Sequence, residues 1–389
     1  MQWKRNLWVL SAAVFIANVS FTLTFPFLPK FIELLGVKEN LSLWSGIMIS
    51  ITFLTYAVMA PIWGSFADKY GKRNMLLRSG LGIAISYVLM GVAVNHWQLF
   101  FLRGLNGLLA GFIPAAIILV ATNTPEFEIG YALGMLNTFI ALGSILGPFV
   151  GGSLVHYAGI RITYFISAAL LCLATVLAVL GTKENVIKPQ GNTILWQELK
   201  NIAHNKVLMV YFFCMVILQT AIYMIQPILP IRISELTSQN TDFLTGLVFS
   251  IMGVSLAIGS PLVSKIRRVP YNNILLWGLL LCSLFSIGQG LTYSISILIL
   301  MRFGFGFANA VVNVSGNVLI TKSASEEMRG RVFGALNALT ALGSVLGPLL
   351  GGLLGERFGT ASAFHGSAVL FIMAGISLWY MKNNIIKPM

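Results

Sequence analysis

Polar side chains recur at helical spacing inside three long apolar stretches of this chain. Amide, hydroxyl and phenol groups donate and accept hydrogen bonds, so their chemistry is recognition rather than bond cleavage. An unsatisfied polar group facing lipid costs several kcal/mol, so such stripes either line a wet cavity or bond to neighbouring helices. Three faces carry these stripes: Asn18, Thr22 and Phe25; Gln219, Tyr223 and Gln226; and Asn309, Asn313 and Asn317.

Two arginines, Arg103 and Arg302, also lie inside apolar stretches, at equivalent places in the two halves of the chain. Ionisable groups inside a membrane are functional candidates by default. Outward snorkelling or capping of a carbonyl is the alternative for both. Asn106 lies one turn after Arg103, so we expect it on the same face.

Other kinds of chemistry have no support in the sequence. The three cysteines fall within apolar stretches and have no metal-ligand spacing, so we expect neither a disulfide nor a metal site. We find no catalytic constellation and no nucleotide-binding loop. We therefore expect a protein that is not an enzyme.

The elements that would position these residues are membrane spans. The chain is 57% hydrophobic and 10% charged, against roughly a quarter charged for a soluble domain. Twelve stretches have about the length that crosses a bilayer, roughly 20 residues. We predict an all-α polytopic membrane protein with no separate soluble domain. The predicted spans are 6–29, 43–66, 75–93, 97–122, 133–155, 163–181, 207–230, 243–264, 272–292, 295–320, 333–355 and 362–381.

An internal repeat divides the chain. GMLNTFIALGSILGPFVGG at 134–152 and GALNALTALGSVLGPLLGG at 334–352 agree at twelve of nineteen positions. Six spans separate the copies, so both run in the same direction through the membrane. We predict two parallel six-helix bundles, 1–181 and 207–389, joined by a cytoplasmic linker at 182–206. In folds of this kind, the site lies between the halves near mid-membrane.

Glycines are regularly spaced within the repeated phrase, on one helix face of each copy. A face without side chains lets a neighbouring backbone approach closely, and proline invites a bend. Static packing would explain one copy, whereas near-verbatim repetition favours a role in the motion of the two halves. The residues are Gly143, Gly147, Pro148 and Gly151 in the first copy, and Gly343, Gly347, Pro348 and Gly351 in the second.

The net charge of +13 does not indicate a nucleic-acid partner. With the N-terminus placed in the cytoplasm, most of the 25 Lys and Arg residues fall in cytoplasmic loops. This asymmetry predicts that both termini are cytoplasmic. The first apolar stretch is too long for a signal peptide and lacks a small-residue cleavage site, so we expect it to remain as a span.

Three motifs resemble those of the twelve-span drug:proton antiporter branch of the major facilitator superfamily. ALGSILGPFVGG resembles the antiporter signature, and FLRGLNG resembles the span-four signature, with Asn106 where glutamine is common. WKRNL and LWSGIMISITFL look most like the bacterial multidrug exporters of this branch. The stretch GSFADKYGKRNMLL resembles the loop 2–3 signature, with Phe66 where leucine is usual; its matching residues are Gly64, Asp68, Gly71, Lys72 and Arg73.

The resemblance implies a central cavity lined by spans 1, 4, 7 and 10, a proton gradient as the energy source and no cofactor. We expect Asp68, at the cytoplasmic end of span two, to hold an inner gate shut, by accepting from a helix N-terminus or pairing with an arginine across the seam. The alternative is that this charged run only anchors the loop on the cytoplasmic surface. This chain departs from many relatives because no acid falls in the middle of a span. We rank Asp68 first as the proton carrier. The other candidates are Glu33 and Glu235 at the outer ends of spans one and seven, and Glu126 or Glu128 in loop 4–5.

A cavity with two arginines and no acid should disfavour lipophilic cations. We therefore predict that neutral, zwitterionic or anionic amphipathic compounds are preferred. The expected function is proton-coupled export of amphipathic small molecules by a monomer in the bacterial cytoplasmic membrane, giving multidrug and antibiotic resistance. A dedicated exporter of one metabolite, such as a siderophore, is the alternative, followed by a non-transporting receptor or scaffold.

Overall fold

The computed structural model describes residues 2–184, 205–266 and 268–384. The described residues form α-helices and short 3-10 segments, with no strand among them. Twelve helical segments of this part of the chain are long and apolar enough to cross a membrane. Helices form here because only a helix satisfies its own backbone groups within an apolar stretch. The predicted all-α, twelve-span fold is confirmed.

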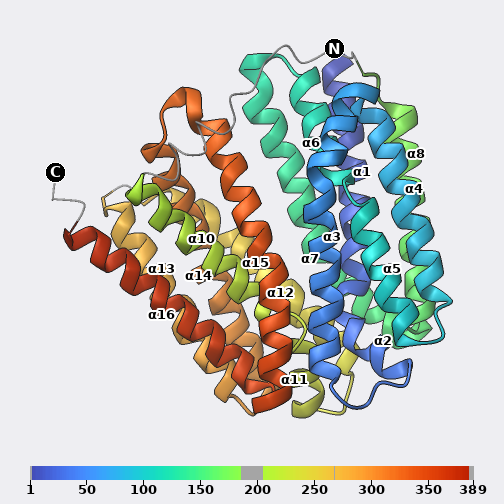
Figure 1. Ribbon diagram of the computed structural model, residues 1–389, viewed down its shortest axis with the longest axis vertical. Coiled ribbons are helices and arrows are strands. Elements are labelled where there is room, and N and C mark those ends of the chain that lie inside the picture. Colours follow the sequence, from blue (N-terminus) through green and yellow to red (C-terminus); the bar gives the residue numbers. More distant parts are fainter. Residues whose placement is uncertain (1, 185–204, 267, 385–389) are drawn as a thin grey trace. The chain divides into compact units, whose positions relative to one another are not determined.

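The first half of the chain supplies six of these spans, built from eight α-helices and two 3-10 segments (Figure 1). They are α1 (Gln2–Thr24), η1 (Phe25–Phe27), α2 (Leu28–Leu34), α3 (Leu41–Tyr70), α4 (Lys72–Gly91), α5 (His96–Leu109), α6 (Phe112–Asn123), η2 (Glu126–Glu128), α7 (Ile129–Ala158) and α8 (Ile160–Gly181).

The second half repeats the pattern after the predicted linker, of which 185–204 lies outside the described residues. Its helices are α10 (Lys206–Ile225), α11 (Leu229–Leu236), α12 (Thr241–Ser264), α13 (Tyr271–Leu291), α14 (Ile295–Ser323), η3 (Glu326–Met328), α15 (Arg329–Phe358) and α16 (Ala361–Asn384).

The chain forms two compact units, and each takes a short piece from the other half of the sequence. Unit 1 consists of Met1–Glu39, Ile51–Gln190 and Gln239–Ser250. Unit 2 consists of Asn40–Ser50, Gly191–Ser238 and Ile251–Met389. The boundaries at 181 and 206 stay a prediction, because contacts group the beginnings of α3 and α12 with the opposite half.

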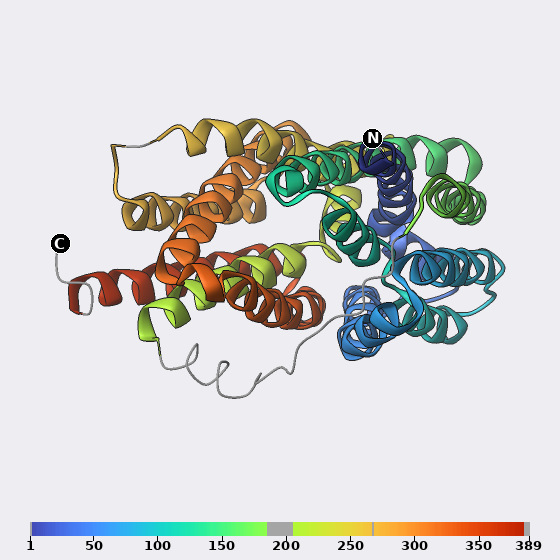
Figure 2. The same ribbon diagram turned by 90° about the horizontal axis from the view of Figure 1, so that it is seen from above.

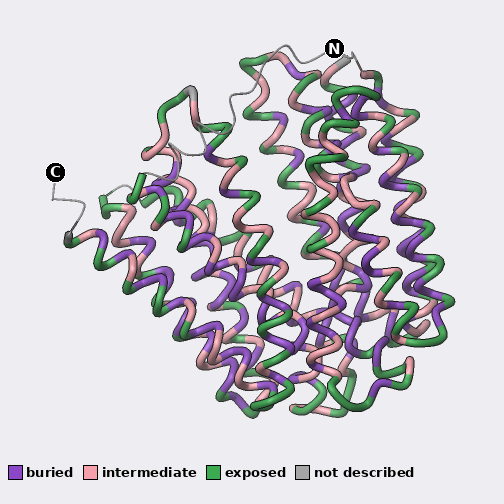
Figure 3. Tube along the Cα trace, viewed as in Figure 1, coloured by how far each residue is buried: buried purple, intermediate pink, exposed green. Residues whose placement is uncertain are grey.

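Corresponding helices make corresponding contacts inside the two units. In unit 1, α1 packs along α7 and α8, and α4 packs along α8 (Figure 2). In unit 2, α10 packs along α15 and α16, and α13 packs along α14 and α16. Buried and exposed residues alternate around these helices, so each presents one face to its unit and another to its surroundings (Figure 3).

Three spans are interrupted by short breaks. In span one, α1 ends at Thr24 before a turn that contains Pro26. In span seven, α10 ends at Ile225, two residues before Pro227. Proline removes a backbone donor, which explains both breaks. Span four divides at Gly111, whose φ of +138° is open to glycine and strained for other residues. Its counterpart α14 runs without a break from Ile295 to Ser323.

Glycines at matching positions bring α3 and α12 close to their partners. In unit 2, a side chain at Gly46 would overlap the carbonyl oxygen of Pro348 and lie 3.2 Å from the Cα of Gly352. In unit 1, a side chain at Gly246 would overlap the carbonyl of Pro148 and lie 3.1 Å from the Cα of Gly152. Small residues allow this approach of two backbones.

Candidate substrate cavities

Unit 1 contains a cavity of about 360 Å³ between α1, α3, α4, α5 and α6. Aromatic rings make up much of its wall. Arg103 and Asn106 of α5 supply polar groups to this cavity, and their predicted role in substrate binding stays a prediction. The aromatic lining residues are Phe21, Phe25, Phe53, Tyr56, Tyr87 and Phe112.

Arg103 is fixed by the packing of α5 on α3. Its carbonyl accepts a hydrogen bond from Thr52 Oγ1 at 3.1 Å, and Thr55 Oγ1 donates to the carbonyl of Gly104 at 2.9 Å. The absence of a side chain at Gly107 lets the backbone of Thr52 approach. Arg103 is only 4% exposed, and its Nε and Nη2 have no hydrogen-bond partner. Snorkelling does not describe this side chain, because its guanidinium stays buried.

Asn106 lies on the same cavity wall and is also buried. Its Nδ2 donates to Ser86 Oγ of α4 at 2.8 Å, which leaves the amide oxygen as an acceptor. The side chain therefore links α5 to α4 while it lines the cavity.

The break between α5 and α6 lies on the same cavity, through Ala110, Gly111, Phe112 and Ile113. Gly111 is the N-cap residue of α6 and offers no side-chain oxygen to the first N–H groups of that helix. On the other side of the break, Arg78 Nη2 donates to the carbonyl of Ala110 at 3.2 Å.

Unit 2 contains a second cavity, of about 450 Å³, between α10, α14 and α15. Its polar lining is neutral, and comprises Gln219, Asn313, Asn317, Asn337 and Thr340. Three of these were predicted, whereas Asn337 and Thr340 were missed. Their spacing with Ser344 on α15 places them on one helix face, a signal that was present inside the repeated phrase.

The predicted stripe on span one is divided between two roles. Asn18 Nδ2 donates to Ser144 Oγ at 2.7 Å and to the carbonyl of Ile140, both on α7. Thr22 Oγ1 is within 3.2 Å of the carbonyl of Gly143. These contacts are the interhelical alternative, and neither residue lines the unit 1 cavity, whereas Phe25 does. A ligand contact for Asn18 and Thr22 stays a prediction.

The stripe on span seven faces α15 and the unit 2 cavity. Gln219 Nε2 donates to Ser344 Oγ at 3.2 Å and lines the cavity. Tyr223 packs with its Cβ against Gly347 of the same helix. Gln226 has a buried Oε1 without a hydrogen-bond partner. Only Gln219 of the three lines this cavity.

The three asparagines of span ten are used differently. Asn309 is buried and accepts a hydrogen bond from Asn313 Nδ2 through its Oδ1. Asn313 and Asn317 line the cavity. The C-terminal part of the stripe, Asn313 and Asn317, therefore lines the cavity, whereas Asn309 packs inside the unit.

Arg302 matches Arg103 in sequence and differs from it in surroundings. It is 1% exposed, its Nη1 donates to Gln289 Oε1 of α13 at 3.4 Å, and its guanidinium lies 5.5 Å from the ring centre of Phe305. It is not among the residues that line the unit 2 cavity.

The glycine faces of the repeated phrase pack inside each unit. Side chains at Gly143, Gly147 and Gly151 would meet the backbone of α1. Those at Gly343, Gly347 and Gly351 would meet α10. The contact between sequence halves instead uses the next positions, Pro148 with Gly152 and Pro348 with Gly352. The three-glycine faces therefore pack within their own halves of the sequence, and a role for them in the motion of the halves stays a prediction.

In the loop 2–3 motif, the described contacts give the capping role to an acid that we had not chosen. Glu184 accepts hydrogen bonds from the backbone N–H groups of Lys72 at 2.7 Å and Arg73 at 2.9 Å. Asp68 lies 3.5 Å from Lys72 Nζ, and 53% of its side chain is exposed. Gly71 makes the turn with a φ of +91°. Gly64 lines a smaller pocket beside Trp63.

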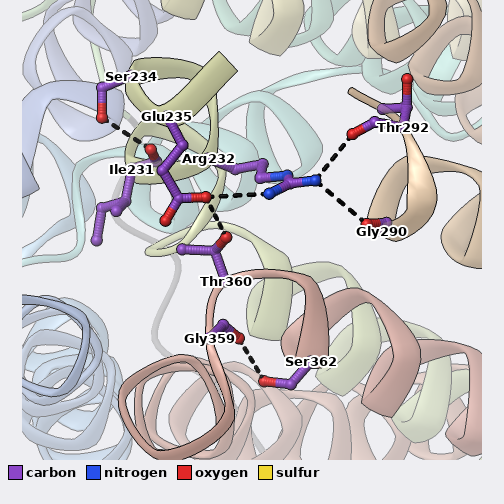
Figure 4. A network of polar contacts seen from close by, with 9 residues as sticks. All are labelled: Ile231, Arg232, Ser234, Glu235, Gly290, Thr292, Gly359, Thr360 and Ser362. Atoms are coloured by element: carbon purple, nitrogen blue, oxygen red, sulfur yellow. Dashed lines mark hydrogen bonds and ion pairs between the residues drawn. The ribbon is translucent and has the colours of Figure 1, made fainter. Parts of the chain in front are cut away.

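The remaining proton-carrier candidates occupy different settings. Glu33 is exposed on α2. Glu235 accepts from Arg232 Nη1 at 3.1 Å and from Thr360 Oγ1 at 2.5 Å (Figure 4). Arg232 Nη2 also donates to the carbonyl of Thr292 at 2.8 Å, so this network ties α11 to two loops of unit 2 (Figure 4).

Sequence reasoning also missed Asp242. It is the one acid classed as buried among those whose burial is described. Its Oδ2 lies 2.6 Å from Lys30 Nζ. Asp242 lies in the first turn of α12, where an acid interacts favourably with the helix dipole. Its position at a span end, rather than in mid-span, gave no signal in the sequence.

Comparison with known proteins places the chain in a family. A family model described as the Major Facilitator Superfamily matches residues 10–291 and 211–387. "Multidrug resistance protein MdtG" of Rahnella sp. (strain Y9602) is 35% identical over 392 residues, covering 99% of this chain and 95% of that protein. The protein of the same name from Proteus mirabilis (strain HI4320) is 35% identical over 384 residues, covering 97% and 96%.

A solved structure has the same fold. A bacterial homolog of the human lysosomal transporter Spinster, inward-facing and unoccupied, has a TM-score of 0.81 at 16% identity, covering 98% of this chain and 97% of that one. The full-length match to transporters, the twelve spans and the duplicated helix pattern agree. The chain therefore belongs to the major facilitator superfamily and is a multi-pass membrane transporter related to the MdtG multidrug resistance proteins.

Proposed function

We propose that the chain is a proton-driven exporter of amphipathic small molecules that works by alternating access. Near full-length similarity to proteins named for multidrug resistance carries this proposal. The unit 1 cavity supports it, because aromatic walls accept varied apolar bodies without fixed hydrogen-bond geometry. Both termini are cytoplasmic in this proposal, following the distribution of Lys and Arg.

The contacts of α3 and α12 suit the movement that alternating access needs. At Gly46 and Gly352, and at Gly152 and Gly246, backbones touch with no side chains between them. Each contact also has one hydrogen bond: Ser50 Oγ to the carbonyl of Val345 at 2.7 Å, and Ser250 Oγ to that of Ile145 at 2.6 Å. At the glycines themselves, separation requires no repacking of side chains, whereas the rings of Phe149 and Phe243, 5.6 Å apart, also pack between α7 and α12 and must part.

The proton carrier is proposed among acids at span ends, because no acid falls in mid-span. Asp68 remains the first candidate, since it is half exposed and paired with one lysine. Glu33 and Glu235 follow, and Asp242 joins them as the buried acid. Glu235 is the least suited of these, because Arg232 and Thr360 hold it in a structural network.

The test is efflux from inverted membrane vesicles with an imposed pH gradient. We expect wild-type vesicles to accumulate an amphipathic dye only when the gradient is present. Asp68→Asn should abolish this accumulation while energy-independent exchange of the dye continues. Glu235→Gln serves as the control, and should retain gradient-driven accumulation. Accumulation without a gradient, or transport that follows an imposed sodium gradient, would exclude proton coupling.

A dedicated exporter of one polar metabolite is the second candidate. The amide-lined cavity of unit 2 favours it, because several fixed amides suit a ligand with matching hydroxyl or carbonyl groups. The two candidates separate in a competition assay. A multidrug exporter is inhibited by many unrelated amphipaths, whereas a dedicated exporter is inhibited only by close analogues of its substrate.

A further inference from the structure

The guanidinium of Arg103 has no ion-pair partner among the described residues. Ion pairs within the described residues join Lys30 to Asp242, Lys72 to Asp68, Arg232 to Glu235 and Arg329 to Glu326. None of them includes Arg103. A buried cation is costly unless it is paired, so a structure that keeps one against a cavity indicates a missing anionic partner.

The break in span four supplies a second, independent positive end on the same cavity. The helix α6 begins at Phe112, and its first N–H groups receive no cap from Gly111. Gly111, Phe112 and Ile113 line the cavity together with Arg103. The N-terminus of a helix carries partial positive charge, and interrupted membrane helices point such ends at anionic groups of substrates.

The two ends of the break are treated unequally. The carbonyl of Ala110, at the negative end of α5, accepts from Arg78 Nη2. The guanidinium of Arg78 lies 3.5 Å from the ring centre of Trp63. The negative end is therefore already neutralised by the chain's own residues. The positive end of α6 has no side-chain cap among the described residues and is therefore open to an anionic group.

We propose that the unit 1 cavity binds the carboxylate or sulfonate of an aromatic amphipath, between Arg103 and the N-terminus of α6. The aromatic body of the ligand packs against Phe21, Phe25 and Tyr56. The name substrate for this ligand rests on the proposed export function, whereas the binding site itself does not. The sequence predicts a preference for neutral, zwitterionic or anionic amphipaths. This proposal restricts the preferred ligands to aromatic anions and assigns their binding to the unit 1 cavity.

Binding without any gradient tests the proposal separately from transport. The probes are 1-anilinonaphthalene-8-sulfonate and N-phenyl-1-naphthylamine, which share one aromatic body and differ in the sulfonate. Full-length protein in phosphatidylcholine nanodiscs is titrated with each probe, and the fluorescence of protein-free nanodiscs is subtracted. Wild type should bind the sulfonate at least about tenfold more tightly than the neutral probe.

Substitution of the arginine should remove only the preference for the anion. In Arg103→Gln, affinity for the sulfonate should fall about tenfold or more and that for the neutral probe should change less than about twofold. Arg302→Gln is the matched control, with the same charge change at the equivalent position of unit 2, and should keep the preference. Equal weakening of both probes, or none, in Arg103→Gln would overturn the proposal.

A second variant keeps the proposal testable if Arg103→Gln does not fold, as judged by gel filtration. Ile113→Asp places a carboxylate in the first turn of α6 on the cavity wall. It should exclude the sulfonate and leave binding of the neutral probe unchanged. Retained sulfonate affinity in this variant contradicts the site.

Nanodiscs that contain phosphatidylglycerol test whether the bound anion comes from a membrane lipid. Displacement of the probe by that lipid would show that the site holds a membrane lipid rather than a substrate.

Discussion

Lys30 Nζ and Asp242 Oδ2 lie 2.6 Å apart, which joins α2 to the first turn of α12 within unit 1. Asp242 is largely enclosed, with 10% of its side chain exposed, whereas Lys30 is 49% exposed. The carboxylate therefore depends on this partner more than the ammonium does. In the same turn, the backbone of Asp242 and Phe243 meets Gly152 of α7.

We predict that Asp242→Asn lowers stability by about 1 kcal/mol, because the ion pair and the dipole interaction of α12 are both lost. The half exposure of Lys30 keeps the effect modest, since water can solvate the freed ammonium. Thermal unfolding followed by fluorescence-detected gel filtration measures the change. The double variant Lys30→Asp with Asp242→Lys should recover part of the loss. No difference between single and double variants would show that the pair contributes nothing.

A methyl group at Gly246 should disrupt the contact of α12 with α7. Its Cβ would overlap the carbonyl of Pro148, and backbone cannot move aside as a flexible side chain can. We expect Gly246→Ala to increase labelling by a membrane-impermeant maleimide of a single cysteine introduced at Ser250. The matched control is Gly134→Ala, a helical position with nothing within 4 Å of the added Cβ. Equal labelling in both variants contradicts this account of the contact.

Glu184 and Asp68 should differ in their effects on loop 2–3. Glu184→Gln loses two charge-assisted bonds at the N-terminus of α4, so we expect about 1–2 kcal/mol of destabilisation. Asp68→Asn loses one long, exposed ion pair, and should change stability by less than about 0.5 kcal/mol. Proteolysis of the loop and thermal unfolding compare the two. A larger loss in Asp68→Asn would return the capping role to that residue.

The charge preference of the unit 1 cavity should reverse when an acid is added beside Arg103. Asn106→Asp is nearly isosteric, and the hydroxyl of Ser86 can donate to the new carboxylate. We expect weaker binding of the anilinonaphthalene sulfonate and stronger binding of tetraphenylphosphonium, each by about tenfold. Asn313→Asp, in the unit 2 cavity, is the control for a general effect of added charge.

The sequence predicts the twelve-span helical fold of this chain well, because the requirement for apolar segments of bilayer length acts over long stretches. The repeated glycine-rich segments, 134–152 and 334–352, show where prediction from the sequence fails. Their glycine spacing predicts a close backbone contact, but not which of two adjacent faces meets which helix. Gly151 meets α1 and Gly152 meets α12, and one residue of rotation separates them.

The residue types of the candidate site could be predicted from the sequence, but the contacts of each side chain could not. Arg103 and Arg302 are equivalent in the sequence, yet Gln289 on α13 reaches only the second. The break at Gly111 could have been suspected from the repeat, since Ala310 stands at the matching place in α14. Alanine resists a φ of +138°, so the second copy continues as one helix.

The exchange of helix beginnings between the units has a consequence for any division of the protein. Unit 2 includes Asn40–Ser50 from the first half of the chain, and unit 1 includes Gln239–Ser250 from the second. A gene divided at the linker would produce two fragments. Each fragment would lack a short helical segment of its unit, which is part of the other fragment. Such fragments should accumulate in the membrane only when made together in one cell, as complementary parts of a single fold.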